Sequence, residues 1–347
     1  MTSTVATATD NRFNNQPVLW GALVAGTLVL ALGSLAIGRY DVPIENVIGI
    51  LAHHVLPIDA EWKDVEQRVV ELIRIPRMLQ AVLVGAALAL SGAALQGAFR
   101  NPLVGPQIVG VSSGAALGGA TAILLSLGTF AVVGSAFVVG VLAMVIVYLI
   151  ARTEGRAPIL MLVLSGVIVS AFCTSMTSLV TFFANPEDSL PAIVYWLMGS
   201  FATASYDKVG ILCIALLLAG VPLLALRFRI NVLSLGDEEA EALGIKVERT
   251  RWIALLAIAG LVAASVSVSG IVGWVGLVVP HFARMLFGPD HRLVLPASMI
   301  MGSAYMLFID NIARTLTASE IPLGVLTAIV GAPVFGWLLR RTRARGW

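Results

Sequence analysis

Charged residues that lie inside long apolar stretches are the first candidates for chemistry in this chain. Asp310 and Arg314 are four residues apart, so a helix would place them on one face as an ion pair suited to apolar surroundings. His281 and Arg284 follow Pro280 in a second apolar stretch. Proline releases a helix carbonyl, so we expect a kink there, either functional or simply packed by a neighbour. His281 is then either a hydrogen-bonded core residue or a proton relay.

A stripe of hydroxyl groups is the second candidate site. Its members recur at helical spacing and are Ser170, Thr174, Thr177 and Thr181. They would share one helix face, which either lines a mildly polar passage or forms hydrogen bonds to another helix. As a passage lining, hydroxyl and small apolar groups would let a bulky solute bind weakly enough to leave again.

A short acidic segment, SLGDEEAEALGI, is predicted to form a helix at the membrane surface. Ser234 and Asp237 can cap its start, acidic residues favour the first turn, and Gly244 ends it. It is too short and too acidic to cross a bilayer, so it is either a docking element or a solvated linker. The candidate docking residues are Ser234, Leu235, Gly236, Asp237, Glu238, Glu239, Glu241, Leu243 and Gly244.

Signatures of catalysis, nucleotide hydrolysis and metal binding are absent from the sequence. It has no phosphate-binding G-x-x-x-x-G-K-S/T loop, no G-x-S-x-G or H-E-x-x-H motif, and no Cys/His cluster with metal-ligand spacing. His53 and His54 are expected at the surface, and Cys173 and Cys213 lie in apolar runs without a disulfide framework. We therefore expect no metal, no cofactor and no enzymatic activity in this chain.

The elements that carry these residues are expected to lie in lipid. Of 347 residues, 58% are hydrophobic and 12% charged, against about 25% charged in soluble domains. The small net charge of +2 excludes a nucleic-acid partner. Because about 20 apolar residues cross the hydrocarbon core, we predict an all-α polytopic membrane protein with about ten spans. The predicted spans are 17–37, 76–99, 107–127, 129–150, 158–184, 205–226, 252–269, 271–287, 293–317 and 322–340.

The Lys and Arg residues predict the orientation of these spans. With an inner N-terminus, most of the 22 fall on inner segments, which places both termini in the cytoplasm. We predict cytoplasmic tails over 1–16 and 341–347 and a single transmembrane domain over 17–340, whose first span is not a removable signal peptide. Two polar segments interrupt it. They are 38–75 outside, where the stretch VIGILAHHVL can lie on the membrane surface, and 227–251 inside.

Three stretches resemble the FecCD/BtuC-type permease family, which serves iron-siderophores, haem and cobalamin. The first is RIPRMLQAVLVGAALALSGAALQGAFRNPLVGPQIVGVSSGAALGG at 74–119. The second, SGIVGWVGLVVPHFARMLFGPDHRLVLP at 269–296, is similar to the family pattern G-x-x-G-F-x-G-L-x-x-P-H-x-x-R, with Trp274 where Phe is commoner. The third is FIDNIARTLTASEIPLGVLTAIVGAPVFGWLL. The matching residues are Asn101, Pro102, Pro280, His281, Arg284, Asp310, Arg314, Pro322 and Gly324.

The resemblance implies the permease of a type II ABC importer in a bacterial inner membrane, built from inverted repeats. It implies a homodimer with a central pathway bordered by the fifth and tenth spans, which favours the passage role of the hydroxyl stripe. Two separate ATPase subunits, which hold ATP and Mg, would dock on the cytoplasmic segment 234–244. A periplasmic substrate-binding protein would pair its acids with Arg68, Arg74 or Arg77, unless Arg74 and Arg77 are helix-end anchors. Whether the dimer is homomeric or heteromeric stays open.

The cargo also stays open at the level of sequence. The resemblance favours a metal chelate, most directly an iron-siderophore, with haem or cobalamin as alternatives, and some similar permeases carry molybdate or tungstate oxyanions. An ion-coupled secondary carrier would have buried acids or lysines along its spans, whereas Asp310 is the one clear intramembrane carboxylate. An intramembrane enzyme would need a nucleophile with its base, or a metal site.

Overall fold

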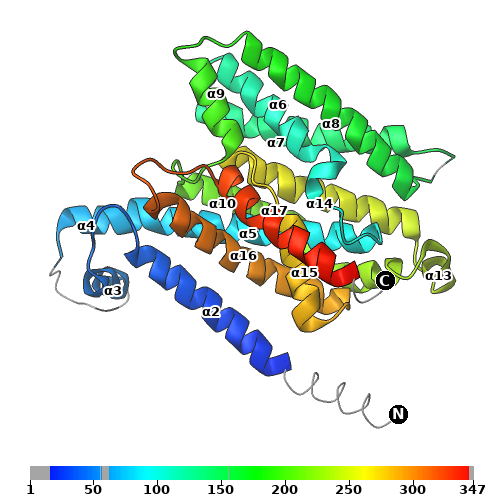
Figure 1. Ribbon diagram of the computed structural model, residues 1–347, viewed down its shortest axis with the longest axis horizontal. Helices are drawn as coiled ribbons and strands as arrows, with labels where there is room; N and C mark the ends of the chain where they lie inside the picture. Colours follow the sequence, from blue (N-terminus) through cyan, green and yellow to red (C-terminus); the bar gives the residue numbers. More distant parts are fainter. Residues whose placement is uncertain (1–15, 55, 57–61, 155, 344–347) are drawn as a thin grey trace.

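A computed structural model provides the structure of this chain. It describes residues 16–54, 56, 62–154 and 156–343. Every regular element within these ranges is helical (Figure 1), so the predicted all-α fold class is confirmed. Residues 1–15 and 344–347 of the predicted tails lie outside the described residues, whereas 341–343 continue the last helix.

Each predicted span coincides with a helix or a run of helices. They are α2 (Gln16–Ala36), α5 (Ile75–Ala98), α6 (Val111–Leu124), α7 (Thr129–Ala151), α8 (Ile159–Phe182), α10 (Tyr206–Ala215) with η3 (Leu216–Gly220) and α11 (Val221–Ala225), α14 (Val247–Ser269), α15 (Val275–Phe287), α16 (His291–Thr315) and α17 (Leu323–Arg343). Outside these spans lies a further helix, α9 (Ser189–Met198). Within the described ranges, seven helical segments are long and apolar enough to cross a membrane. Exposed side chains such as Leu28, Phe130 and Phe182 suit lipid rather than water, as expected of a membrane protein.

Helices α5 and α14 form the centre of the bundle, because most of their side chains are small and buried. A Cβ atom added at Gly85 would lie 2.2 Å from the carbonyl oxygen of Gly302, and one at Gly92 would lie 1.9 Å from that of Gly276. These glycines therefore serve close helix packing, as predicted. Helices α5 and α14 are the second spans of the two halves, and the third spans, α6 and α15, are both short. Two structurally related halves would produce this correspondence.

The polar segment 38–75 is largely helical. The element α3 (Ile44–His53) covers most of the stretch VIGILAHHVL and packs into a small apolar cluster of its own. The element α4 (Asp64–Arg68) continues through the π-helical turn η1 (Val69–Arg74) into α5 without a break. The second span therefore begins at residue 64 and not at 76, because charged residues hide this extension from a hydropathy criterion.

Two predicted spans are interrupted near their first residues. In 107–127, the 3₁₀ turn η2 (Pro106–Val109) is separated from α6 by Gly110, whose φ is 80°. In 271–287, the first residues are not helical, and Trp274 has a φ of 67° at the residue before α15. A hydropathy pattern cannot show such breaks, since the apolar character continues through them.

The turn predicted after the second span is confirmed. The side-chain oxygen of Asn101 accepts a hydrogen bond from the N–H of Leu103 at 2.9 Å, with Pro102 between them. Arg100 precedes them with a φ of 52°. The chain thereby leaves α5 and reaches η2.

The polar segment 227–251 contains two short helices, α12 (Arg227–Leu233) and, within the acidic stretch, α13 (Asp237–Ala242). Gly244 ends α13 as predicted, since its φ of 79° is left-handed. The predicted caps by Ser234 and Asp237 are both wrong, because Gly236 occupies the N-cap position of α13 and Asp237 is the first residue of the helix. The hydroxyl of Ser234 instead donates to the carbonyl of Asn231 at 2.6 Å, at the end of α12.

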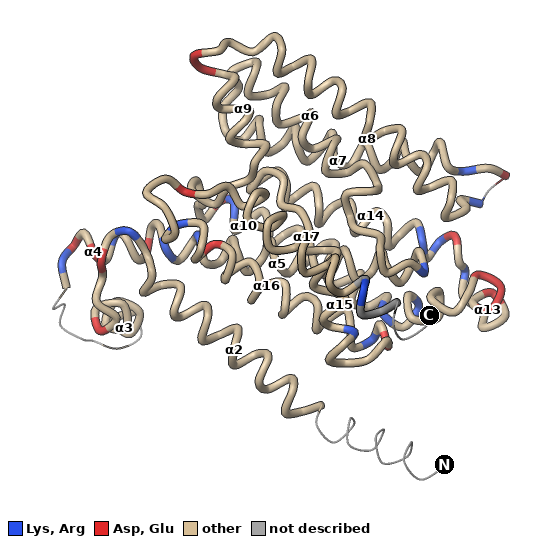
Figure 2. The backbone as a smooth tube through the Cα atoms, in the orientation of Figure 1, with Lys and Arg blue, Asp and Glu red and all other residues tan. Residues whose placement is uncertain are grey.

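Charged residues gather mainly at the two ends of the bundle (Figure 2). We call the end that carries α3 and α4 the α4 end, and the opposite one, which carries α13, the α13 end. The start of α2 and the end of α17 both lie toward the α13 end (Figure 1). An even number of crossings produces this arrangement.

Candidate translocation site and coupling surface

The predicted hydroxyl stripe borders a groove of ≈ 410 Å³. The polar and apolar side chains around it include Thr174, Thr177, Ser178 and Thr181 of α8, Ser113 of α6 and Leu197 of α9. Ser170, the fourth predicted residue, is not part of this lining, and its hydroxyl has no hydrogen-bond partner among the described residues. Three of the four predicted residues therefore meet at one surface, together with hydroxyl groups that the sequence did not single out.

The groove offers weak and uncharged polar contacts. The hydroxyls of Thr177 and Thr181 each donate to a carbonyl one turn earlier in α8, at 2.8 Å. They do not bond across to another helix, which was the alternative for this stripe. Among the described residues that line the groove, none is charged. A solute can pass along such a surface without being held by an ion pair.

Irregular backbone segments meet beside this groove. Gly199 follows α9 with a φ of 79°, and its carbonyl accepts a hydrogen bond from the N–H of Leu323 at 2.9 Å. The family-motif residue Gly324 allows this approach, since an added Cβ would lie 2.7 Å from the carbonyl oxygen of Met198. Pro322 directly precedes α17, as predicted for a helix start. The ends of α9 and α17 are thereby held together by their own backbone groups.

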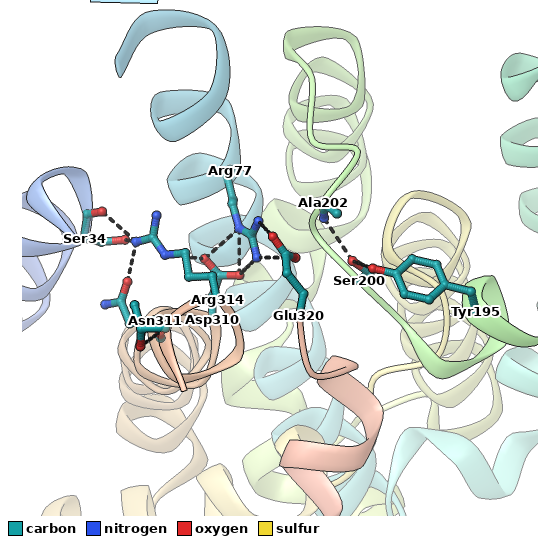
Figure 3. A network of polar contacts seen from close by, with 10 residues as sticks. Ser34, Arg77, Tyr195, Ser200, Ala202, Asp310, Asn311, Arg314 and Glu320 are labelled. Atoms are coloured by element: carbon teal, nitrogen blue, oxygen red, sulfur yellow. Dashed lines mark hydrogen bonds and ion pairs between the residues drawn. The ribbon is translucent and has the colours of Figure 1, made fainter. Parts of the chain in front are cut away.

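A buried ion network joins several helices at the α4 end (Figure 3). Arg77 of α5 donates to Asp310 of α16 at 2.8 Å and to Glu320, before α17, also at 2.8 Å. Arg314 lies 3.7 Å from Asp310, so the predicted pair is present, but Arg77 makes the closer contact. Arg314 also donates to the hydroxyl of Ser34 in α2 at 2.7 Å. The network therefore connects α2, α5, α16 and the start of α17.

Two of the three arginines predicted to dock a binding protein face inward. Arg77 is held in the ion network and is 6% exposed. Arg74 is 3% exposed and donates to carbonyls at the end of α2, including that of Ala36 at 2.9 Å. The docking role is corrected for both, because their guanidinium groups have internal partners, and Arg74 is the helix-end anchor that the sequence left as an alternative. Arg68 is exposed.

A second buried arginine holds the acidic segment at the α13 end. Arg251, in the first turns of α14, donates to both carboxylate oxygens of Asp237, at 2.8 and 2.9 Å, and to Glu248 at 3.1 Å. Its side chain is 1% exposed, and Arg100 approaches Asp237 to 3.7 Å. Asp237 is therefore a clamp on α14 and not a free docking residue. The sequence did not single out Arg251, because an arginine just before a predicted span resembles an ordinary charge at a helix end.

Most of the other predicted docking residues are exposed. We call them the α13 surface, which consists of Leu235, Glu238, Glu239, Glu241, Leu243 and Gly244. The side chains of Leu235 and Leu243 are 64% and 65% exposed, and they share this surface with the three glutamates. Of the remaining three, Gly236 is buried, and Ser234 and Asp237 are half-buried. Apolar side chains ringed by acids are a surface that another protein can cover.

Pro280 lies inside α15, so the carbonyl of Gly276 lacks its usual helical N–H donor. The side-chain amide of Gln96, on α5, donates to this carbonyl at 3.3 Å and accepts a hydrogen bond from Arg284 at 2.6 Å. This favours the packed kink over the functional one. His281 is half-buried and makes no hydrogen bond within the described part of the chain, which is against the first of its two predicted roles, the hydrogen-bonded core histidine. Gln96 is a residue that sequence reasoning missed, although an amide in an apolar span is a signal.

A helical bundle with an uncharged groove and an exposed acidic helix is the architecture of a transport permease. The chain belongs to the FecCD transport family, whose model matches residues 26–341. The molybdate import system permease protein MolB of Haemophilus influenzae is 40% identical over 96% of this chain and 98% of its own. A Helicobacter pylori permease named for iron chelatin transport is 44% identical over 78% of this chain and 82% of its own.

A solved structure extends the comparison to three dimensions. A metal-chelate type ABC transporter in an inward-facing conformation covers 94% of this chain and 99% of its own, with a TM-score of 0.84 and 42% identity. The chain is thus a membrane-embedded ABC importer permease, and permeases of this family pair with ATPase and substrate-binding proteins. It has the fold of metal-chelate permeases.

Proposed function

We propose that this chain is the transmembrane permease subunit of an ATP-driven importer that carries a metal chelate across the bacterial inner membrane. An iron-siderophore is the first candidate cargo, and haem and cobalamin are chelates of the same class. The groove beside Thr174, Thr177 and Thr181 carries this proposal, because ≈ 410 Å³ of uncharged, weakly polar space suits a bulky solute that must leave again. The iron chelatin relative supports the same cargo class.

Two identical copies of the chain enclose the pathway in this proposal. Thr174 and Ser178 are exposed, so the groove opens onto the surface of a single subunit. Phe172 and Phe182 on the same helix are 61% and 79% exposed, which leaves apolar area for contact. A second copy placed against α8 closes the groove into a passage. Copurification of two differently tagged copies distinguishes this homodimer from a heteromeric pair.

The α13 surface docks an ATP-binding subunit, one below each copy of the permease. ATP and Mg are bound by that subunit, because the permease sequence has no phosphate-binding loop. The contact between Asp237 and Arg251 carries the motion of the docked subunit into α14. ATP binding and hydrolysis then shift the dimer between outward-open and inward-open states.

This assignment also orients the chain. The α13 end and both termini are cytoplasmic, and the α4 end faces the periplasm. A substrate-binding protein docks at the α4 end, where the exposed Arg68 can pair with its acidic side chains.

A molybdate-type or tungstate-type oxyanion is the second candidate cargo, since MolB matches nearly the whole of both chains. The groove favours the chelate, because the hydroxyl protons of Thr177 and Thr181 are already donated to the backbone and are not free for an oxyanion. An ion-coupled carrier is disfavoured, because Arg77 engages Asp310 and leaves no free intramembrane acid on α16 to bind an ion.

Uptake by proteoliposomes that contain the permease, its ATPase and its binding protein tests the proposal. We expect ATP-dependent uptake of a radiolabelled iron-siderophore that molybdate does not compete away. Uptake of molybdate alone would replace the chelate by the second candidate. Uptake driven by a proton gradient through the permease without an ATPase would overturn the importer itself.

A triple variant, with Thr174, Thr177 and Thr181 each changed to Val, tests the groove. Losing weak polar contacts worth about 0.5–1.5 kcal/mol each should lower uptake roughly tenfold or more while ATP hydrolysis continues. Thr27→Val is the matched control, because its hydroxyl makes the same bond to a carbonyl one turn earlier, at 2.8 Å, on a helix away from the groove. Unchanged uptake in the triple variant would contradict the pathway role.

A further inference from the structure

A second, more polar cavity of ≈ 360 Å³ lies at the α13 end. It is formed by the turn after α5, the residue after α12, and the facing parts of α15 and α16. Its lining consists of Gln96, Arg100, Asn101, Pro102, Ser234, His281, Arg284 and His291. Two guanidinium and two imidazole groups thus face one space, and no carboxylate belongs to this described lining. It shares no lining residue with the groove, so it is separate from the proposed cargo pathway.

The charge of Arg284 is not balanced by the described part of the chain. Its hydrogen-bond partner there is the neutral amide oxygen of Gln96, at 2.6 Å, and its Nη2 atom is buried without a partner. The buried Arg77 and Arg251 are each met by two carboxylates, and the buried Arg74 is met by backbone carbonyls, whereas the half-buried Arg284 has one amide oxygen. A shielded guanidinium without an anion is unfavourable, because desolvation is not repaid by any opposite charge.

A second observation comes from the other side of the cavity. His291 is 8% exposed, and its Nδ1 atom is also buried without a partner in the described ranges. Its backbone N–H is fixed by the side-chain oxygen of Asn231 at 2.8 Å. At the mouth, the side chain of Arg100 is 41% exposed and lies 3.7 Å from the carboxylate of Asp237. The cavity is therefore bordered by two buried nitrogen atoms without partners, one on a guanidinium and one on an imidazole.

We propose that this cavity binds a phosphate-type oxyanion. Such an anion presents several acceptor oxygens around one centre, which fits the fork of a guanidinium and the side-chain amide of Asn101 better than a single-atom anion does. Two sources share this chemistry, namely the headgroup of an anionic phospholipid and free phosphate. Met285 and Leu286 follow Arg284 and are 47% and 52% exposed, so lipid lies close to the site.

Occupation of the cavity has a structural consequence. Ser234 belongs to the link between α12 and α13, whereas Arg100 and Arg284 belong to the α5 turn and to α15. One bound oxyanion would therefore connect the link between α12 and α13 to the transmembrane helices. This connection lies beside the ion pair between Asp237 and Arg251. The inference does not depend on the identity of the cargo.

Binding to the purified full-length chain tests the inference. Native mass spectrometry with added phosphatidylglycerol or phosphatidylcholine probes the headgroup, and calorimetry with inorganic phosphate in neutral detergent probes the free anion. Arg284→Gln should weaken binding about tenfold or more, since a hydrogen bond to a charged group is worth about 1.5–3 kcal/mol. Arg292→Gln is the matched control, because this exposed arginine pairs with Asp290, lies next to His291 and does not line the cavity.

The outcomes separate the two sources and the alternatives. Retention of phosphatidylglycerol without phosphate binding identifies a lipid headgroup, and phosphate binding identifies a soluble anion, and both support the site. Arg100→Gln, at the exposed mouth, gives the same test if Arg284→Gln fails to fold. Equal binding by Arg100→Gln and Arg292→Gln overturns the proposal. A wild-type chain that binds neither probe also overturns it. If Arg284→Gln then no longer binds the ATPase subunit, a carboxylate of that partner fills the cavity instead.

Discussion

Two of the buried arginines, Arg77 at the α4 end and Arg251 at the α13 end, are paired with carboxylates in different ways. Arg77 meets shielded carboxylates, since the side chains of Asp310 and Glu320 are 1% and 19% exposed. Arg251 meets Asp237 and Glu248, whose side chains are 40% and 29% exposed. A shielded pair holds helices in one arrangement, whereas a half-exposed pair lies within reach of a partner protein. The first cluster acts as a scaffold and the second as a link.

The largest effect, a loss of stability, is expected from Arg77→Leu, which breaks the shielded ion pair. Asp310 would stay buried without its main cation, and breaking a buried pair from one side lowers the free energy of unfolding by about 3–5 kcal/mol. Thermal unfolding of the purified chain in detergent measures the loss. Arg68→Leu, at the exposed end of α4, is the matched control and should leave the midpoint of thermal unfolding unchanged. A wild-type midpoint for Arg77→Leu would remove the scaffold role.

Asp237→Asn should affect coupling more than stability. The amide keeps part of the contact, and Glu248 still compensates Arg251. Because a hydrogen bond to a charged group is worth about 1.5–3 kcal/mol, we expect the uptake per ATP hydrolysed to fall about tenfold. Parallel measurements of transport and hydrolysis in proteoliposomes give this ratio, with Asp188→Asn, at an exposed residue between α8 and α9, as control. If both rates decline together, the clamp is not a link.

The smallest effect is expected from Leu243→Ser on the α13 surface. Losing part of an apolar contact should weaken binding of the ATPase subunit by about 1 kcal/mol, or about fivefold in affinity. The stability of the isolated permease should not change. A titration of the ATPase against the permease in detergent measures the affinity. Ile48→Ser is the control, because that side chain is 61% exposed at the opposite end. Equal weakening by both variants would argue against docking at α13.

Features that depend on neighbours along the chain were predictable from the sequence. All ten predicted spans coincide with helices, because apolar length is a local property that lipid selects directly. The turn at Asn101 and the end of α13 at Gly244 follow from the backbone preferences of those residues. The same criterion missed α9, which is only ten residues long, and the charged extension of the second span back to residue 64.

Features that depend on partners far along the chain were not predictable. The sequence pairs Asp310 with Arg314 on one helix face, but Asp310 is held more closely by Arg77, 233 residues away. Arg74 and Arg77 resemble surface charges in the sequence, yet the fold supplies carbonyls and carboxylates that draw both inside. Among the docking candidates, Asp237 was turned inward by an arginine that follows it by 14 residues.

The sequence by itself determined that this protein lies in a membrane, which stretches form its apolar helices, and which stretches carry hydroxyl groups or acids. Those properties come from the composition of contiguous residues, which decides their solvent. The tertiary structure decided which charges are neutralised and which are left over, so that Arg77 became part of a scaffold and Arg284 borders a cavity. The physical reason is that an ion pair depends on distance and burial in space, and helix packing alone sets both.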